Sequence, residues 1–181
     1  MFDKEISFTG KHAIYLRQLA KGNTTDKNSL QKEWVFQYNY EVLLAAPMIG
    51  FLRSRKSQKD TSTSVTNKIF SDVLNKIRDD LELNYRLIML LDNKDKIPVE
   101  ERLNRAFRYD RDLEKRKPGD EIFWDYVRGG IEILYEEFVE KTGSEEENIQ
   151  HLYEFIEKFQ FVHLTQLDTD AIYKLCGESS T

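Results

Sequence analysis

The chain has little cysteine, little proline and glycine, and no long apolar run. Its one cysteine, Cys176, cannot form an internal disulfide. Its longest apolar pieces, such as residues 42–52, fall short of the roughly 18 to 20 residues that cross a bilayer. The N-terminus has no basic leader followed by an apolar stretch, so we expect no secretory signal. Together these absences predict a soluble cytoplasmic protein.

The scarcity of proline and glycine also bears on the fold class. Only three prolines and eight glycines occur in 181 residues, and the long segments between them repeat apolar residues at helical spacing. A hydrophobic fraction of 40% is enough to fill a core, although 33% of the residues are charged. We therefore predict an all-α fold, a single-domain bundle of about six or seven helices that spans residues 1–181.

Two segments in the second half of the chain carry strong helical patterns. Apolar residues follow the three-four step along residues 66–92, which predicts one long helix. A second helix is expected to begin after Pro118 and Gly119, with Asp120 as its N-cap, because its apolar residues line one side. Its end is expected at Gly143.

Directly after Gly143 the sequence contains a capping box. Ser144 and Glu147 have the spacing at which each side chain accepts a hydrogen bond from the other residue's backbone N–H. The pattern predicts a further helix, whose apolar stripe consists of Ile149, Leu152, Tyr153, Ile156 and Phe159.

The remaining segments are less regular. A short helix is expected to end at Gly22, and a mostly buried one to begin near Asn39. Pro47 lies inside the second of these and should kink or split it, because proline lacks a backbone donor and clashes with the preceding turn. The polar residues 57–66 are predicted to form a mobile loop. A last short helix is expected before a flexible tail at residues 178–181.

Charge is distributed unevenly along the chain. Residues 1–117 hold 23 Lys and Arg against 17 Asp and Glu, whereas residues 118–181 hold 4 against 15. The acidic C-terminal third could dock a basic partner, or it could compensate the basic part within the fold. The net charge of −5 argues against a general polyanion binder.

The most basic segment is residues 102–117, which follows a helix start marked by Pro98 and two glutamates. Arginine recurs there at every third position, and its planar fork can bind phosphate with two hydrogen bonds. Two further arginines precede the polar loop. The candidate phosphate or nucleic-acid contacts are Arg102, Arg105, Arg108, Arg111, Arg116, Arg53 and Arg55. The alternative interpretation is a solvated helix face, partly neutralised by nearby acids.

No catalytic, cofactor-binding or metal-binding residue is predicted. His12, His151 and His163 stand without the partner spacing that a zinc site requires. Cys176 has no neighbouring histidine, which favours an inert thiol. The pair Gly129-Gly130 lies inside a helical pattern, so close helix packing or a local bend is expected.

Four blocks of sequence carry a resemblance to other proteins. They are YEVLLAAPMIGFLRSRKSQKD, YRLIMLLD, ERLNRAFR and YVRGGIEILYE, and they fall within about residues 36–136. This part of the chain resembles a group of small uncharacterised helical proteins that prokaryotes encode beside DNA-modification and phage-defence genes. The blocks contain no motif of known chemical role. The resemblance implies a cytoplasmic accessory subunit that works with larger DNA-handling partners.

Two hypotheses about binding follow, and one about catalysis. The leading one is a non-catalytic accessory or adaptor subunit that binds a larger protein partner through the acidic C-terminal third and exposed aromatic residues. The alternative is a nucleic-acid-binding protein that contacts phosphates through the arginine-rich segment 102–117. An enzyme with an unrecognised site would need a deep pocket with perturbed titratable groups, and the sequence nominates no residues for one. The oligomeric state stays open.

Overall fold

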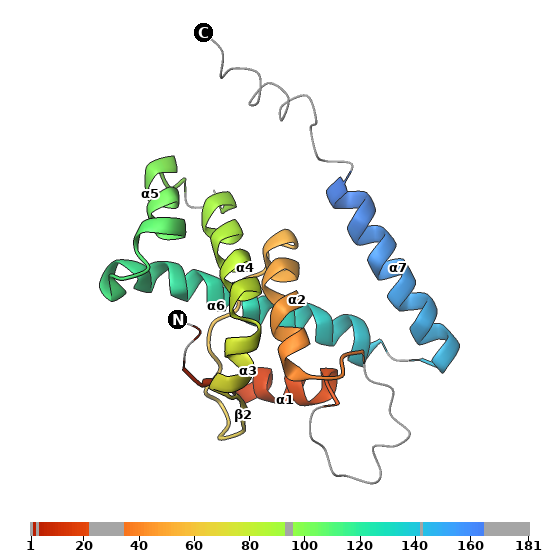
Figure 1. Cartoon of the computed structure of the whole chain (residues 1–181). Coiled ribbons are helices and arrows are strands. Elements are labelled where there is room, and N and C mark those ends of the chain that lie inside the picture. Colours follow the sequence, from red (N-terminus) through yellow and green to blue (C-terminus); the bar gives the residue numbers. More distant parts are fainter. Residues whose placement is uncertain (1, 3, 22–34, 93–95, 142, 165–181) are drawn as a thin grey trace. The chain divides into compact units, whose positions relative to one another are not determined.

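The computed structural model describes residues 2, 4–21, 35–92, 96–141 and 143–164 (Figure 1). The chain divides into two compact units, residues 1–141 and residues 142–181, where the sequence predicts one domain. The all-α fold class is confirmed, since the described residues form seven α-helices and one short two-stranded sheet. Within these residues no helix combines the length and the apolar character needed to cross a membrane.

The secondary-structure elements of unit 1 are mainly helices, with two short strands among them. They are β1 (Ile6–Thr9), α1 (Gly10–Leu19), α2 (Asn39–Leu52), β2 (Thr66–Ile69), α3 (Ser71–Lys76), α4 (Arg78–Leu91), α5 (Val99–Leu103), the π-helical η2 (Asn104–Arg108), α6 (Leu113–Tyr135) and the π-helical η3 (Glu136–Glu140). Unit 2 contains α7 (Glu145–Leu164). The strands pair antiparallel, with Ile6 opposite Ile69 and Thr9 opposite Thr66.

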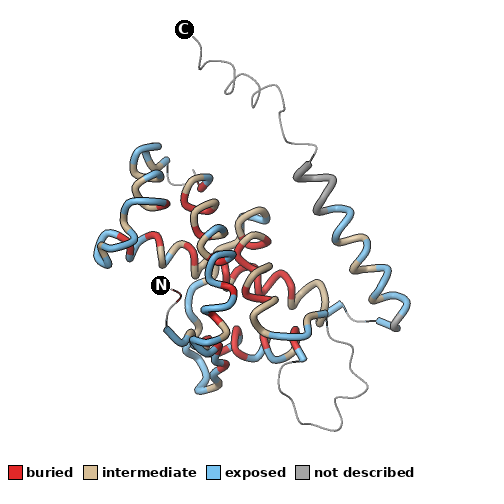
Figure 2. Tube along the Cα trace, viewed as in Figure 1, coloured by how far each residue is buried: buried red, intermediate tan, exposed pale blue. Residues whose placement is uncertain are grey.

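Helix α6 is the central element of unit 1. It packs mainly against α2, and also against α1 and α4. Its buried apolar side chains belong to the stripe that the sequence predicts, and they are Phe123, Tyr126, Val127, Ile131 and Leu134. Figure 2 shows the buried residues of unit 1 gathered along α6 and on the sides of α1, α2 and α4 that face it. Each such side chain contributes about 1.5 to 3 kcal/mol by leaving water.

Glycines allow α2 and α6 to approach at backbone distance. A Cβ atom added to Gly130 would lie closer than 3.0 Å to the carbonyl oxygen of Ala46, and one added to Gly50 would lie as close to the carbonyl oxygen of Tyr126. Real Cβ atoms essentially never come so near. The close helix packing predicted for Gly129-Gly130 is therefore confirmed.

Helix α2 begins at Asn39, as predicted, and runs unbroken through Pro47. The split that the sequence predicted as one outcome there does not occur. Proline leaves the preceding turn without one backbone donor. In this turn the side-chain amide of Asn84, from α4, donates a hydrogen bond to the Leu44 carbonyl oxygen at 3.0 Å.

The single helix predicted over residues 66–92 is wrong. Residues 66–69 form β2 instead, because they pair with β1, and burial there alternates along the strand. Helix α3 follows, and Ile77, with φ −111° and ψ 12°, separates it from α4. The sequence prediction combined the apolar residues of one strand and two helices into a single helical pattern. Within α4 the stripe is confirmed, since Leu81, Tyr85 and Ile88 are buried.

Helix α6 starts earlier than the sequence suggests. The expected start after Pro118-Gly119, with Asp120 as the N-cap, is wrong, because α6 begins at Leu113. Asp112 is the N-cap, and its carboxylate accepts a hydrogen bond from the Lys115 backbone N–H at 3.2 Å. An aspartate at this position satisfies a free donor of the first turn, and the helix continues through Pro118.

The capping box ahead of α7 is confirmed. The Ser144 N–H donates to the Glu147 carboxylate at 2.7 Å, and the Glu147 N–H donates to the Ser144 hydroxyl at 3.4 Å. The last predicted helix, Cys176 and the tail at 178–181 lie outside the described residues.

Candidate functional site

Among the seven candidate arginines, Arg55 and Arg116 form ion pairs with carboxylates of unit 1. Arg55 donates two hydrogen bonds to the carboxylate of Glu136, each at 2.6 Å. The side chain of Arg116 is only 9% exposed and pairs with Asp110 and Asp120. These guanidinium groups already have carboxylates as partners, and binding a phosphate would require breaking those pairs.

The arginine row on α5 and η2 is also partly engaged. Arg102 donates to the Leu90 carbonyl at 2.8 Å, and Arg105 pairs with Glu101 at 2.9 Å. Arg108 is exposed and bonds the Asn104 side chain on its own helix, while Arg111 is exposed beyond it. Only two members of the row thus present themselves to solvent.

Residues 104–108 of this segment form a π-helical turn. The Tyr109 N–H donates to the Asn104 carbonyl at 3.0 Å, which is a bond to the fifth preceding residue. This wider turn changes the angle between successive side chains. Ala106 is buried, while Leu103 and Phe107 are exposed.

The two basic clusters lie apart in unit 1. Arg55 contacts Glu132 and Glu136 near the C-terminal end of α6, whereas Arg116 belongs to the N-terminal end of the same helix. Residues 116 and 132 are separated by about 24 Å along the axis at ~1.5 Å per residue. The seven arginines therefore do not form one surface. Arg53, the last of them, is exposed just after α2.

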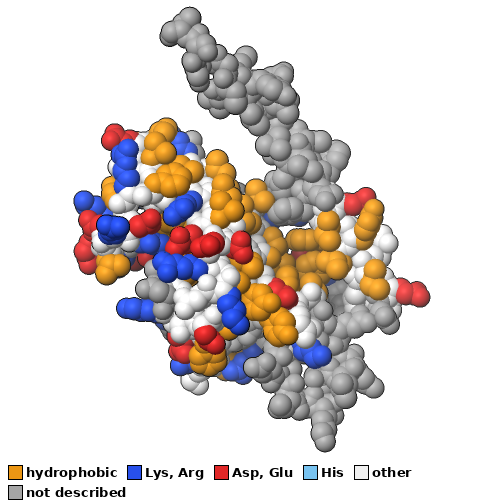
Figure 3. All heavy atoms as spheres, in the orientation of Figure 1, with side chains coloured by type: hydrophobic (Ala, Val, Ile, Leu, Met, Phe, Trp, Pro, Cys, Tyr) orange, Lys and Arg blue, Asp and Glu red, His pale blue; other side chains and the backbone are white. Residues whose placement is uncertain are grey.

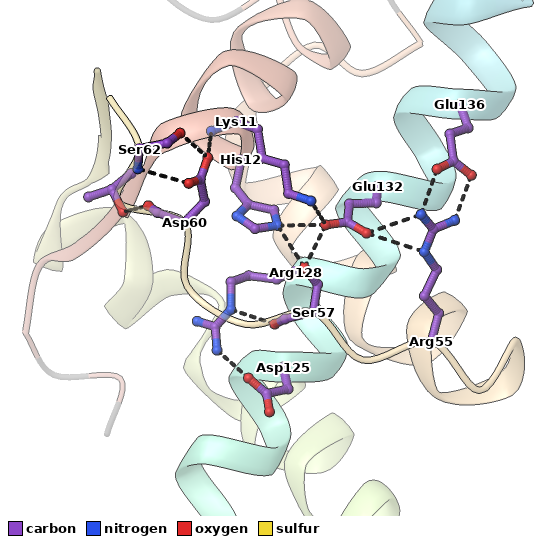
Figure 4. A network of polar contacts seen from close by, with 11 residues as sticks. Lys11, His12, Arg55, Ser57, Asp60, Ser62, Asp125, Arg128, Glu132 and Glu136 are labelled. Carbon is purple, nitrogen blue, oxygen red and sulfur yellow. Dashed lines mark hydrogen bonds and ion pairs between the residues drawn. The ribbon is translucent and has the colours of Figure 1, made fainter. Parts of the chain in front are cut away.

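The structure brings together a different group, a polar network centred on Glu132 of α6 (Figure 4). Glu132 is 6% exposed. One carboxylate oxygen, Oε1, accepts from Lys11 at 2.8 Å, from His12 Nε2 at 3.0 Å and from the Ser57 hydroxyl at 2.5 Å. The other oxygen accepts from Arg55 Nε at 3.2 Å. Several donors thus compensate the cost of burying this charge.

The segment predicted as a polar loop supplies part of this network. Residues 57–65 form neither helix nor strand, and they are tied to their neighbours by hydrogen bonds. The Ser57 N–H donates to the Asp125 carbonyl at 2.9 Å, and Arg128 donates to the Ser57 carbonyl at 2.8 Å. The Asp60 carboxylate accepts from the Lys11 backbone N–H at 2.6 Å, at the start of α1. These contacts hold the hydroxyl of Ser57 against Glu132.

Electrostatics fix the protonation states of the two buried groups. Burial by itself would raise the pKa of Glu132, but the hydrogen bonds from Lys11, Ser57 and His12 outweigh it and lower the pKa to about 2. Burial lowers the pKa of His12, and the hydrogen bond to Glu132 opposes this only in part. At neutral pH we therefore expect an ionised Glu132 beside a neutral His12.

The neutral imidazole has one occupied nitrogen and one without a partner. Nε2 carries the proton and donates it to Glu132, because a carboxylate only accepts. Nδ1 is then a hydrogen-bond acceptor. It is buried, and no group among the described residues bonds to it. In Figure 4 this edge of the ring is turned away from Glu132.

This arrangement is not a serine-nucleophile triad. In such a triad the hydroxyl and the carboxylate bind opposite nitrogens of the histidine. Here Ser57 and Glu132 both approach Nε2, at 3.3 and 3.0 Å, and the Ser57 hydroxyl donates to Glu132. The histidine cannot take the serine proton, so the geometry does not support acyl transfer.

A pocket of about 310 Å³ opens beside His12. It is formed mainly by β1, the start of α1 and one side of α6, with the loop residue Lys59 at its edge. Its lining consists of Lys4, Glu5, Ile6, Ser7, Phe8, Thr9, His12, Lys59, Trp124 and Arg128. Three lining residues are cationic and one is anionic, so the pocket is suited to an anion. Among the described residues no group of three or more His, Cys, Asp or Glu could hold a metal ion.

Sequence reasoning missed this site. His12 and Glu132 are 120 residues apart, and neither belongs to a motif with fixed spacing. One local signal was present, because Glu132 interrupts the apolar run of residues 131–134 on the buried side of a helix. A glutamate in that position predicts a buried, partnered charge.

Comparisons with protein-family models, with curated proteins and with solved structures gave no match. The resemblance of residues 36–136 to proteins encoded near DNA-modification and phage-defence genes therefore stays a prediction.

Proposed function

We propose that the chain is a non-catalytic accessory subunit that binds a larger protein partner through helix α7. The observation that carries the proposal is an exposed apolar stripe on this helix. Ile149, Tyr153 and Ile156 are 62%, 59% and 47% exposed, and they recur at the spacing of one helix face. Figure 3 shows hydrophobic side chains on the surface of α7.

An amphipathic helix of this kind fits a hydrophobic groove, in which anchors at i, i+4 and i+7 are buried together. The N-terminus of α7 is already fixed by the capping box of Ser144 and Glu147. The helix contains five glutamates and one lysine. Charge complementarity then favours a partner whose apolar groove has a basic rim.

The resemblance of residues 36–136 suggests the setting of this partner. It would be a larger protein of a prokaryotic DNA-modification or phage-defence complex, encoded nearby. In that setting the acidic helix would hold the partner, and the partner would handle the DNA.

Site-specific photo-crosslinking tests this proposal on the full chain. A photoreactive phenylalanine in place of Tyr153 should crosslink in cells to one larger protein, which mass spectrometry identifies. Ile149→Asp should abolish the crosslink, because it places a charge in the apolar contact. Gln150→Asp adds the same charge at an exposed neighbouring position and should preserve it. Crosslinks confined to the same chain or to a second copy would refute the proposal.

Direct nucleic-acid binding, the second candidate function, would depend on the two exposed arginines of the row on α5 and η2 and the turn after it, Arg108 and Arg111. Because the other arginines of the row are engaged and the net charge is −5, we expect no salt-sensitive DNA binding by this chain. Fluorescence anisotropy with duplex and single-stranded DNA over a salt series measures it.

An Arg108→Ala/Arg111→Ala variant serves as the comparison in that experiment. If the wild type did bind, and the variant lost about two units of the logarithmic salt slope, phosphate contacts by these arginines would be established. The accessory-subunit proposal would then need a direct DNA contact added to it.

A further inference from the structure

We propose that the pocket beside His12 binds a phosphate group, either inorganic phosphate or a small phosphomonoester. The proposal rests on unit 1 alone and does not depend on α7 or its partner. It follows from an acceptor that lacks a donor, from the charge of the lining, and from the size of the pocket.

The ring edge of His12 that faces away from Glu132 carries Nδ1. The residue is 1% exposed, and its Nδ1 has no bonding partner among the described residues. Because Nε2 donates to Glu132 at 3.0 Å, Nδ1 can only accept a hydrogen bond. A buried acceptor without a donor is costly, and a ligand that brings an O–H group would satisfy it.

The lining of the pocket includes lysines whose charge is not paired within the described residues. Lys4 and Lys59 are exposed, and neither forms an ion pair with another described residue. The carboxylate of Glu5, which also lines the pocket, is paired with Lys68 at 2.8 Å. Two ammonium groups are thus available to an anion. A strongly negative group such as phosphate suits them better than a neutral ligand.

Phosphate differs from other common anions because it can also donate a hydrogen bond. A carboxylate or a sulfate is fully ionised at neutral pH and offers acceptors only. A phosphate group has a second pKa near ~6 to 7, so it keeps an O–H donor in part of the population beside its charged oxygens. The complementary groups belong to residues that line the pocket: His12 carries the unpartnered acceptor, and Lys4 and Lys59 carry donors.

The pocket also has room for a small organic body. Its volume of about 310 Å³ lies at the lower end of the range for small-molecule sites. Phe8 and Trp124 form apolar walls, and their rings pack edge to face with centroids 6.1 Å apart. A phosphomonoester with a small apolar group would contact these rings.

The test is an NMR titration of the full-length protein with sodium phosphate and sodium sulfate at matched ionic strength. We expect phosphate to bind roughly tenfold or more tightly than sulfate, because only phosphate donates to Nδ1. The ¹⁵N resonance of His12 Nδ1 should shift with phosphate. Lys59→Glu should weaken phosphate binding about tenfold or more, while Lys76→Glu, the same change at an exposed site on α3, should not.

Further titrations distinguish inorganic phosphate from a phosphomonoester as the ligand, and they include the results that would overturn the proposal. Tighter binding of phenyl phosphate than of inorganic phosphate would assign the site to a phosphomonoester, and the reverse order would assign it to the free ion. Equal affinity for sulfate and phosphate without a shift of the Nδ1 resonance would overturn the proposal. So would equal losses in the two lysine variants, or no saturable binding of either phosphate.

Discussion

Gly130→Ala is expected to destabilise unit 1 by about 2 kcal/mol or more, although alanine is the better helix former. The new Cβ would lie within 3.0 Å of the Ala46 carbonyl oxygen, a backbone atom that cannot rotate away. Helices α2 and α6 would have to separate, and the side chains packed between them would lose contact. Urea denaturation followed by circular dichroism measures the loss.

Gly143→Ala is the matched control for this change. Its added Cβ would meet Glu147 in unit 2 and would leave the contact between α2 and α6 unchanged. We expect its effect on the denaturation midpoint to be small. An unchanged or raised midpoint for Gly130→Ala would mean that α2 and α6 do not meet at this glycine.

Glu132→Gln is expected to cost about 3 to 5 kcal/mol of stability at pH 7, because it removes the shared partner of buried and half-buried donors. Lys11 and Arg55 would keep their charges without this carboxylate, and the Ser57 hydroxyl would lose its strongest acceptor. Denaturation curves at pH 7 measure the cost. Glu121→Gln, at an exposed position of the same helix, should have little effect.

The same variant should change how stability depends on acid. The pKa of Glu132 is about 2 in the folded protein against an ordinary value of 4.5. Its contribution is therefore complete above pH 4.5 and is lost as the pH falls toward 2, a total on the order of 3 kcal/mol. Burial also lowers the pKa of His12, so neutral His12 favours the folded state above pH 6.5 and this contribution falls under more acid conditions.

Glu132→Gln should consequently flatten the stability curve between pH 4.5 and 2. Its wild-type counterpart should lose stability steadily over the same interval. Parallel curves for the two proteins would show that the low pKa of Glu132 is not what couples folding to pH.

The sequence predicted local structure correctly where residues close along the chain determine it. Ser144 and Glu147 lie three residues apart, so their reciprocal hydrogen bonds depend on little else, and the helix start was predicted correctly. The stripe of α6 was found for the same reason, since apolar residues repeat at helical spacing from Phe123 to Leu134. The start of α6 was missed because Pro118-Gly119 was taken as the helix boundary, whereas the helix runs through both residues and Asp112 is its N-cap.

Features that depend on distant partners could not be predicted. Residues 66–69 form a strand only because residues 6–9 pair with them. Arg55 looked like a free phosphate ligand, since its carboxylate partners Glu132 and Glu136 lie 77 and 81 residues further along the chain. The network of His12 and Glu132 is the extreme case, because the position of Glu132 in an apolar run indicates a buried charge but does not identify His12, 120 residues away, as its partner.

The long separation between partners has a consequence for the order of folding during synthesis. Helix α1 and strand β1 emerge from the ribosome early, but the pairing of β1 waits for residues 66–69, and His12 waits for Glu132, 120 residues later. At ~5 to 20 residues per second, the ribosome takes on the order of ten seconds to deliver that carboxylate. Until then the apolar faces of α1 and α2 have no α6 to cover them. We therefore expect the nascent N-terminal half to expose apolar surface during synthesis, and the full chain to fold more slowly than a bundle built from local contacts.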